Sequence, residues 1–206
     1  MALVTISAAY GAQGSETGHK LAERLGVPFL DRAIPVEVAD RLAVPLEEAE
    51  TRDETPGGFV DRLLGSFMQM GGLYGATIPP GDAPDEAAFR LATEEIIRKH
   101  AESGSGVIIG RAGMIVLADN PEVVRVRLGG PREARIEQAM RLHDLSRGEA
   151  ERQARENDGV REAWIQRFYG RDVKDPSLYD LVVNATRFDA DACVELIVTA
   201  VEARRR

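Results

Sequence analysis

The sequence contains few of the features that mark secreted or membrane proteins. Its 206 residues include one cysteine, Cys193, so no internal disulfide can form. No apolar run is long enough to span a bilayer, and no basic stretch followed by a long apolar one marks a secretory signal. Aromatic residues make up only 5%, so the core must consist mainly of Leu, Val, Ile and Ala. These absences predict a globular cytoplasmic protein with no membrane partner.

Lysine is also scarce, with three lysines against 23 arginines, and the net charge of −8 argues against binding to nucleic acid. The negative charge lies in residues 33–103, which carry fourteen acidic and six basic side chains, a composition typical of an inserted lobe. Nine arginines fall within 132–171. Arginine binds phosphate through two parallel hydrogen bonds, so this excess of arginine is compatible with a phosphate site. The arginines of this stretch alternate with acidic residues, which is also typical of a helix face exposed to solvent.

Hydrophobic patterning predicts an α/β fold with helices between short β-branched runs. Each run is apolar enough to be buried on both faces, which favours a five-stranded parallel sheet covered by helices on both sides. The predicted strands are Leu3–Ser7, Val27–Leu30, Val107–Ile109, Val123–Leu128 and Leu181–Val183. The predicted helices are His19–Leu25, Ile34–Leu42, Phe59–Met70, Asp85–Ser103, Arg132–His143, Arg147–Asn157, Val160–Tyr169 and Ala190–Ala203. Gly26 is expected to end the first helix, and Ser146 with Glu149 to form a capping box.

A glycine-rich turn follows the first strand and precedes the first helix. Main-chain amides in such a turn, together with the positive end of the helix, suit an anion such as phosphate. The turn misses the strict pattern G-x-x-x-x-G-K-[ST], because Thr17 or His19 stands where lysine is required. The motif therefore leaves two readings, a phosphate loop or a turn without a ligand. The candidate binding residues are Gly11, Ala12, Gln13, Gly14, Ser15, Glu16, Thr17 and Gly18.

Two further polar residues follow predicted strands. Asp31 comes directly after the second strand, and Arg111 follows Gly110 after the third. Ligands of open α/β sheets bind beyond the carboxyl ends of the strands, so both side chains are expected near the glycine-rich turn. Alone, an acid in the position of Asp31 is more often a helix cap or turn residue, and Arg111 is also compatible with a surface arginine that caps a helix end.

The opening run ISAAYGAQGSETGHKLAERLGVPFLDRAI resembles that of the cytidylate kinase-like proteins, within the nucleoside monophosphate kinase superfamily. The segments VIIGRAG, VREAWIQRFYG and YDLVVNATRFDADACVELI are also similar, so the resemblance spans nearly the whole chain in order. The matching residues of the opening are Ile6, Ser7, Tyr10, Gly11, Gly14, Glu16, Gly18, Leu21, Ala22, Leu25, Gly26, Pro28 and Asp31.

The resemblance implies a P-loop kinase-type three-layer α/β/α sandwich with a five-stranded parallel sheet. The core would be 1–32, 104–131 and 172–206. An inserted helical lobe, 33–103, would bind the nucleoside monophosphate, and an Arg-rich helical lid would be 132–171. The implied reaction is transfer of the ATP γ-phosphoryl group, with Mg²⁺, to CMP, dCMP or a similar small acceptor.

The resemblance also implies roles for individual residues. Amides of 11–18 would cradle the donor phosphates, and Arg111 would hold the acceptor phosphate. Asp31 would lie near the acceptor or a metal-bound water. Arg155 and Arg161 would neutralise charge in the transition state. Since the two arginines are six residues apart, they are expected on separate helices or on either side of a break at Asp158–Gly159.

Several residues depart from the family pattern. The loop has no lysine, Ser15 replaces an alternative arginine, Ala8 replaces the arginine before the tyrosine, and Ala112 replaces an acid after Gly-Arg. Losing one contact to developing charge typically costs roughly a hundred- to a thousandfold in rate. His19 and Lys20 lie inside the predicted helix, from which they would have to reach back.

These departures keep other functions open beside the kinase. One alternative is a nucleotide-binding or regulatory protein with a degenerate loop. Another is an interaction module in which 33–103 forms a partner surface through Met68, Met70, Leu73 and Tyr74, residues that ordinary lobe packing would also explain. A homodimer stays open as well, since no feature of the sequence encodes the oligomeric state.

Overall fold

The structure is a computed structural model that describes residues 2–30, 86–110 and 112–204. The predicted helices Ile34–Leu42 and Phe59–Met70 therefore lie outside the described residues. The chain divides into two compact units, one made of residues 1–31 and 97–206, and the other of residues 32–96. Of the second unit, the structure describes the residues that form the first part of one helix.

The first unit contains a five-stranded sheet in which all neighbours pair in parallel, in the order β2-β3-β1-β4-β5. The central strand β1 lies between β3 and β4, with Leu3 opposite Gly106 on one side and Val123 on the other. The predicted parallel sheet is confirmed. Its strands are β1 (Leu3–Ala8), β2 (Phe29–Leu30), β3 (Gly106–Ile109), β4 (Val123–Gly129) and β5 (Leu181–Asn184).

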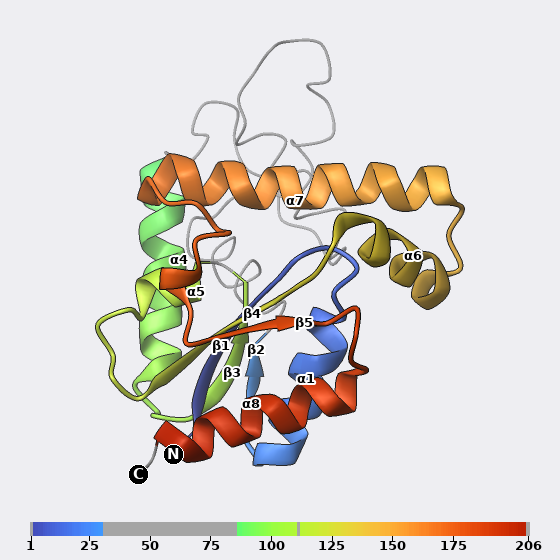
Figure 1. Cartoon of the computed structure of the whole chain (residues 1–206). Coiled ribbons are helices and arrows are strands. Elements are labelled where there is room, and N and C mark those ends of the chain that lie inside the picture. Colours follow the sequence, from blue (N-terminus) through green and yellow to red (C-terminus); the bar gives the residue numbers. More distant parts are fainter. Residues whose placement is uncertain (1, 31–85, 111, 205–206) are drawn as a thin grey trace, which may run out of the picture. The chain divides into compact units, whose positions relative to one another are not determined.

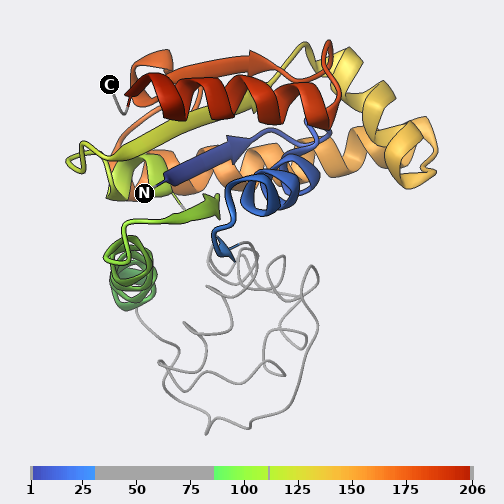
Figure 2. The same ribbon diagram turned by 90° about the horizontal axis from the view of Figure 1, so that it is seen from below.

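Helices connect the strands, as Figures 1 and 2 show. Gly26 ends the first of them in a left-handed conformation, with φ 65° and its amide bonded back to the helix, as expected. The helices are α1 (Gly14–Leu25), α4 (Glu86–Ala101), α5 (Gly113–Val116), α6 (Arg132–His143), α7 (Arg147–Tyr169) and α8 (Ala190–Arg204), with a 3₁₀ turn at Pro176–Leu178. No helix among those described has an apolar stretch of the length that a bilayer requires.

One face of the sheet is apolar and is covered by α1 and α8, which lie side by side in Figure 2. Alternate residues of a strand point to the same face, so Val4 and Ile6 of β1 join Val126 of β4 there. Leu21 of α1 and Ile197 of α8 pack on them, and all five are at most 1% exposed. Burial of this cluster is the main contribution to the stability of the sheet.

The opposite face is partly polar, which corrects the expectation that every strand is buried on both faces. Thr5 and Ser7 of β1 lie opposite Arg125 and Arg127 of β4, and the two arginines are only half-buried. The short helix α5 covers part of this face, where Gly113 packs against the side chain of Thr5. Polar side chains thus line one face of the sheet toward the carboxyl ends of β1 and β4.

Helices α6 and α7 form a hairpin whose facing sides are apolar, with Ile136 and Ala139 packed against Ala150 and Ala154. The predicted capping box begins α7: the Ser146 hydroxyl accepts a hydrogen bond from the Glu149 amide, and the Glu149 carboxylate accepts one from the Ser146 amide. The prediction of two helices separated at Asp158–Gly159 is wrong. Helix α7 continues through Gly159, because packing along its length offsets the roughly 1 kcal/mol that a mid-helix glycine costs.

Candidate functional site

The turn between β1 and α1 is open toward solvent at the start of the helix. Gln13 precedes α1 in a left-handed conformation, with φ 56°, and its side chain does not cap the helix. Instead, its Nε2 donates to the carbonyl oxygens of Ala185 at 2.9 Å and Phe188 at 3.2 Å. The first amides of a helix have no carbonyl partner within the helix, so those of Gly14 and Ser15 remain free to bind an anion.

Two glycines allow the turn to pack closely against its neighbours. Gly11 has a φ of 75°, and a Cβ at this position would lie 2.2 Å from the carbonyl oxygen of Arg135 on α6. A Cβ on Gly14 would lie 2.3 Å from that of Ala8. The absence of side chains at Gly11 and Gly14 thus lets α6 touch the turn and lets α1 begin directly above the end of β1.

Tyr10 fastens the α6–α7 hairpin to the turn. Its hydroxyl donates to Oε1 of Gln153 on α7 at 2.5 Å, and its ring packs beside Ile136 and Ala139 of α6. Its carbonyl oxygen accepts a hydrogen bond from Nη1 of Arg135 at 2.6 Å. The hairpin and the turn are therefore joined through side-chain and main-chain atoms of one residue.

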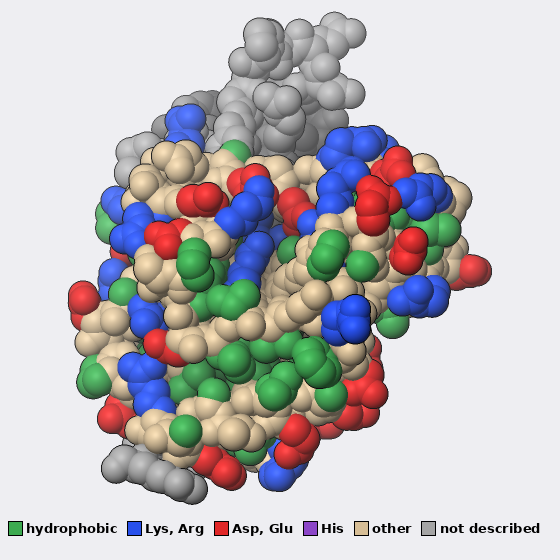
Figure 3. Space-filling view, in the orientation of Figure 1, with side chains coloured by type: hydrophobic (Ala, Val, Ile, Leu, Met, Phe, Trp, Pro, Cys, Tyr) green, Lys and Arg blue, Asp and Glu red, His purple; other side chains and the backbone are tan. Residues whose placement is uncertain are grey.

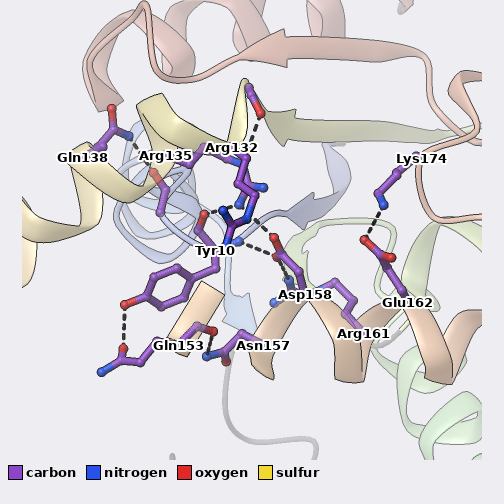
Figure 4. A network of polar contacts seen from close by, with 12 residues as sticks. Tyr10, Arg132, Arg135, Gln138, Gln153, Asn157, Asp158, Arg161, Glu162 and Lys174 are labelled. Carbon is purple, nitrogen blue, oxygen red and sulfur yellow. Dashed lines mark hydrogen bonds and ion pairs between the residues drawn. The ribbon is translucent and has the colours of Figure 1, made fainter. Parts of the chain in front are cut away.

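Three arginines from different elements gather beside the turn, and they are called the arginine cluster below. Arg127 of β4 donates from Nη1 to the Ser7 hydroxyl at 2.7 Å. Arg135 of α6 and Arg161 of α7 both donate to the carboxylate of Asp158, at 2.8 and 3.3 Å. Figure 4 shows the side chains of Tyr10, Arg135, Asp158 and Arg161 converging on one another.

The arginine cluster carries more positive than negative charge. Burial lowers the pKa of Arg161, the neighbouring charges of Arg127 and Arg135 lower it further, and the charge of Asp158 opposes both effects. Asp158 bonds to Arg135 and Arg161, and no carboxylate of the described residues bonds to Arg127, so among these residues one carboxylate balances three guanidinium groups. In the space-filling view, basic side chains form a band below α7, beside a hollow in the surface (Figure 3). This surplus charge favours an anionic ligand.

Tyr179 borders the same cluster beside Ser7 and Arg127. It is only 8% exposed, and its hydroxyl donates to the carbonyl oxygen of Val173 at 2.8 Å. Burial raises the pKa of Tyr179, whereas the nearby hydroxyl of Ser7 and the charge of Arg127 lower it. Tyr179 is therefore an uncharged side chain at the border of the cluster at physiological pH.

The structure unites some of the predicted site residues. The Tyr10 amide, at the start of the turn, and Arg161 both donate to the carboxylate of Asp158, so Arg161 lies near the turn. Arg155 is exposed on α7 and makes no hydrogen bond or ion pair within the described part of the chain. Six residues along a continuous helix amount to a rotation of about 240°, so Arg155 and Arg161 point to different sides of α7. Asp31 and Arg111 lie outside the described residues.

The basic residues of α1 do not replace the missing loop lysine. Nζ of Lys20 lies 3.3 Å from the Glu16 carboxylate and 3.0 Å from that of Asp191. His19 lies 3.3 Å from the Glu23 carboxylate, with its ring at the edge of Phe29. Both side chains are thus paired with carboxylates along the outside of α1.

Sequence reasoning missed Arg127, Arg135 and Asp158. A signal for Arg127 was present in the strand VVRVRLG, where arginines alternate with buried aliphatic residues and so point to one face of the sheet. Arg135 was one of nine arginines in an Arg-rich stretch and had no local mark to distinguish it. The sequence marks Asp158 only as part of a helix break.

The described residues fit nucleotide phosphates better than a resident metal ion. Within the described ranges, no group of three or more His, Cys, Asp or Glu side chains could hold a metal. Uncapped amides and three guanidinium groups are donors that match phosphate oxygens. A Mg²⁺ ion that arrives with a nucleotide takes most of its ligands from phosphates and water, so it does not require such a group.

Comparison with known proteins gives a consistent result. The model of the cytidylate kinase-like family matches residues 3–187. A cytidylate kinase of Archaeoglobus fulgidus is 26% identical over 206 residues, covering 98% of this chain and 96% of the relative. A cytidylate kinase of Methanopyrus kandleri is 27% identical over 128 residues, covering 58% of this chain and 66% of the relative.

Solved structures show the same fold at low sequence identity. An uncharacterized protein from Eubacterium ventriosum has a TM-score of 0.66 and 20% identity, with 98% of both chains covered. The shikimate kinase of Bacteroides thetaiotaomicron has a TM-score of 0.52 and 16% identity, again with 98% of both chains covered. The predicted P-loop kinase-type fold, with its five-stranded parallel sheet, is therefore confirmed.

Proposed function

Because this chain belongs to the cytidylate kinase-like family, we propose that it transfers the γ-phosphoryl group of ATP to a nucleoside monophosphate such as CMP or dCMP. A phosphate oxygen of the acceptor forms the new bond to the γ-phosphorus, and the bond to the β-phosphate oxygen breaks, releasing ADP. ATP, bound with Mg²⁺, supplies the phosphoryl group. The observation that carries the proposal is the gathering of the arginine cluster beside the uncapped start of α1.

The residues of this chain supply positioning and positive charge. The free amides of Gly14 and Ser15 bind donor phosphate oxygens at the start of α1. Arg161 faces the group that is transferred and neutralises the charge that develops on it. Water must be kept away from that group, and the α6–α7 hairpin, which Tyr10 fastens to the turn, covers this side of the site.

The arginine cluster also compensates for the missing loop lysine. Arg135 reaches the turn from α6, where its guanidinium contacts the carbonyl oxygen of Tyr10. It thus brings a permanent positive charge to the turn from outside the motif, whereas a P-loop lysine does so from within. This arrangement accounts for a kinase whose loop itself contains no basic residue before His19.

The remaining assignments concern the acceptor. We propose that residues 33–103 form the lobe that holds the nucleoside monophosphate and that residues 132–171 form the lid. In the sequence, Asp31 and Arg111 come just after two neighbouring parallel strands, β2 and β3, and ligands of open α/β sheets bind beyond such strand ends. Arg111 would hold the acceptor phosphate there, and Asp31 would lie near the acceptor.

A second candidate is a nucleotide-binding protein with little or no turnover. It is favoured by the ion pairs of Lys20 with Glu16 and Asp191. They engage the ammonium group of Lys20, so it does not stand in for the missing loop lysine. Such a protein would use the same cluster to bind a nucleotide and would transmit its binding to a partner.

One pair of measurements separates the candidates. In a coupled assay of ADP release, we expect turnover with Mg-ATP that depends on an added monophosphate, with CMP and dCMP compared against UMP, AMP and GMP. In thermal unfolding, Mg-ATP and CMP together should raise Tm through mass action. A rise in Tm without ADP release would select the second candidate. No rise in Tm with any nucleotide at millimolar concentration would exclude both.

A further inference from the structure

The carboxylate of Asp158 is held by donors from three separate segments. Oδ1 accepts a hydrogen bond from the Tyr10 amide at 2.9 Å and from Nη1 of Arg161 at 3.3 Å. Oδ2 accepts one from Nη1 of Arg135 at 2.8 Å. The donors belong to the turn, to α7 and to α6, and the side chain of Asp158 is only 20% exposed. A carboxylate from the middle of α7 thus contacts the main chain of the turn (Figure 4).

This set of donors is the kind that binds a phosphate group. The main-chain amide of Tyr10 and two guanidinium groups offer hydrogen bonds to several oxygens of one anion. The carboxylate of Asp158 accepts from these donors with two oxygens that share a single negative charge. A phosphate group would bring more oxygens and more charge to the same donors, and so it can compete for them.

We infer that Asp158 occupies a phosphate subsite and that a phosphate group of the substrate displaces it. The inference deepens the proposed function and rests on it for the identity of the substrate. Only the two carboxylate oxygens of Asp158 take part in the contacts, so rotation of this one side chain frees all three donors. Asp158 thereby lowers the affinity of these three donors for phosphate, because a phosphate group that binds to them must first replace the carboxylate.

The test compares the wild-type protein with Asp158→Asn, using inorganic phosphate as the probe and calorimetry to measure Kd. The amide has nearly the shape of the carboxylate without its charge. Removing one charge next to the anion should tighten phosphate binding about tenfold. Glu156→Gln is the matched control, because Glu156 lies two residues away on α7, is exposed and, among the described residues, pairs only with Arg152, 3.7 Å away. Its Kd should equal that of the wild type.

Equal or weaker phosphate binding by a folded Asp158→Asn variant would overturn the inference and show that Asp158 only orients the arginines. A second measurement on the wild type covers the case in which the variant does not fold. On titration with phosphate, the amide resonance of Tyr10 should shift, because that amide exchanges a carboxylate for a phosphate oxygen. Shifts at Gly14 and Ser15 without one at Tyr10 would equally overturn it.

These measurements are independent of turnover. Tighter phosphate binding by Asp158→Asn in a protein that releases no ADP with any monophosphate would reject the proposed kinase activity and retain the subsite. Turnover with CMP combined with unchanged phosphate binding in the variant would retain the kinase and reject the role of Asp158.

Discussion

Arg125 and Arg127 lie two residues apart on β4 and point to the same face of the sheet, yet their surroundings differ. Arg125 donates to Asp180 through Nη2 at 2.9 Å and through Nε at 3.2 Å. Arg127 makes no ion pair within the described residues and donates to the hydroxyl of Ser7. A guanidinium without a carboxylate partner, next to a glycine-rich turn, is available to a ligand. One strand thus carries a structural arginine and a candidate binding arginine.

Replacing Arg127 should therefore affect binding, whereas replacing Arg125 should affect stability. We expect Arg127→Ala to weaken binding of Mg-ATP or CMP by roughly 10- to 100-fold, the value of a charge-assisted hydrogen bond, with little change in Tm. Arg125→Ala should leave binding unchanged and cost about 1 kcal/mol of unfolding free energy, because it breaks an ion pair whose side chains are 21% and 25% exposed. Calorimetry and urea unfolding of both variants check this. Similar binding by the two variants would contradict a ligand role for Arg127.

Arg161 should matter for the rate of phosphoryl transfer. In Arg161→Ala we expect kcat to fall by roughly a hundred- to a thousandfold, because a positive charge at the transferred group is lost. Folding should persist, since the side chain of Arg161 is 34% exposed and its contact with Asp158 is long, at 3.3 Å. Coupled ADP release and a thermal scan measure the two effects.

Arg155→Ala is the companion variant on the same helix. Since Arg155 is exposed and turned away from Arg161, the geometry predicts that most of the turnover remains. A loss as large as that of Arg161→Ala would mean that α7 changes its orientation during the reaction and that both arginines act, as the family resemblance implies. An Arg161→Ala protein that does not fold would make Arg161 a structural residue instead.

Gly11 should tolerate no side chain. In Gly11→Ala the new methyl group would meet the carbonyl oxygen of Arg135 in a left-handed backbone conformation, so we expect a loss of more than about 3 kcal/mol in unfolding free energy. Gly26→Ala separates the effect of the steric clash from that of the left-handed backbone conformation. Gly26 has a similar φ of 65° and open space around its Cα, so only the backbone strain of about 1–2 kcal/mol should appear. If urea unfolding gave the same loss of unfolding free energy for Gly11→Ala and Gly26→Ala, α6 would have to shift to accommodate the methyl group.

The capping box of α7 should make stability depend on pH. The Ser146 hydroxyl and amide donate to the Glu149 carboxylate and hold the pKa of Glu149 below its usual value. A lowered pKa stabilises the folded state above the unfolded value of about 4.3, and this stability is lost as pH falls through the folded pKa. Ser146→Ala should cost about 1 kcal/mol at pH 7 and less at pH 3.

Thermal unfolding at both pH values checks this prediction, with Glu149→Gln as the control. The glutamine cannot ionise, so the effect of adding Ser146→Ala to Glu149→Gln should be the same at pH 7 and pH 3. A pH-independent cost of Ser146→Ala in the otherwise wild-type protein would show that only the hydrogen bond from the Glu149 amide to Ser146 contributes to stability.

Much of the fold could be predicted because its signals are local. Short β-branched runs such as that of β1 and the helix stop at Gly26 depend on neighbouring residues. The capping box at Ser146 likewise needs only a spacing of three residues. The continuity of α7 could not be predicted in this way. Gly159 disfavours a helix locally, and only packing of α7 on α6 and the contacts of Asp158 with the turn overcome that preference.

The amino-acid sequence alone determined the elements, their order and the placement of the glycine-rich turn between a strand and a helix, because hydrophobic period and backbone freedom act over a few residues. The tertiary structure decided which charges meet. Arg127, Arg135 and Asp158 come from three elements, and no local pattern says that they meet. Their convergence depends on the strand order and on the packing of the α6–α7 hairpin against Gly11. Electrostatic interactions act through space, so a site made of charges from distant segments exists only once the chain has folded.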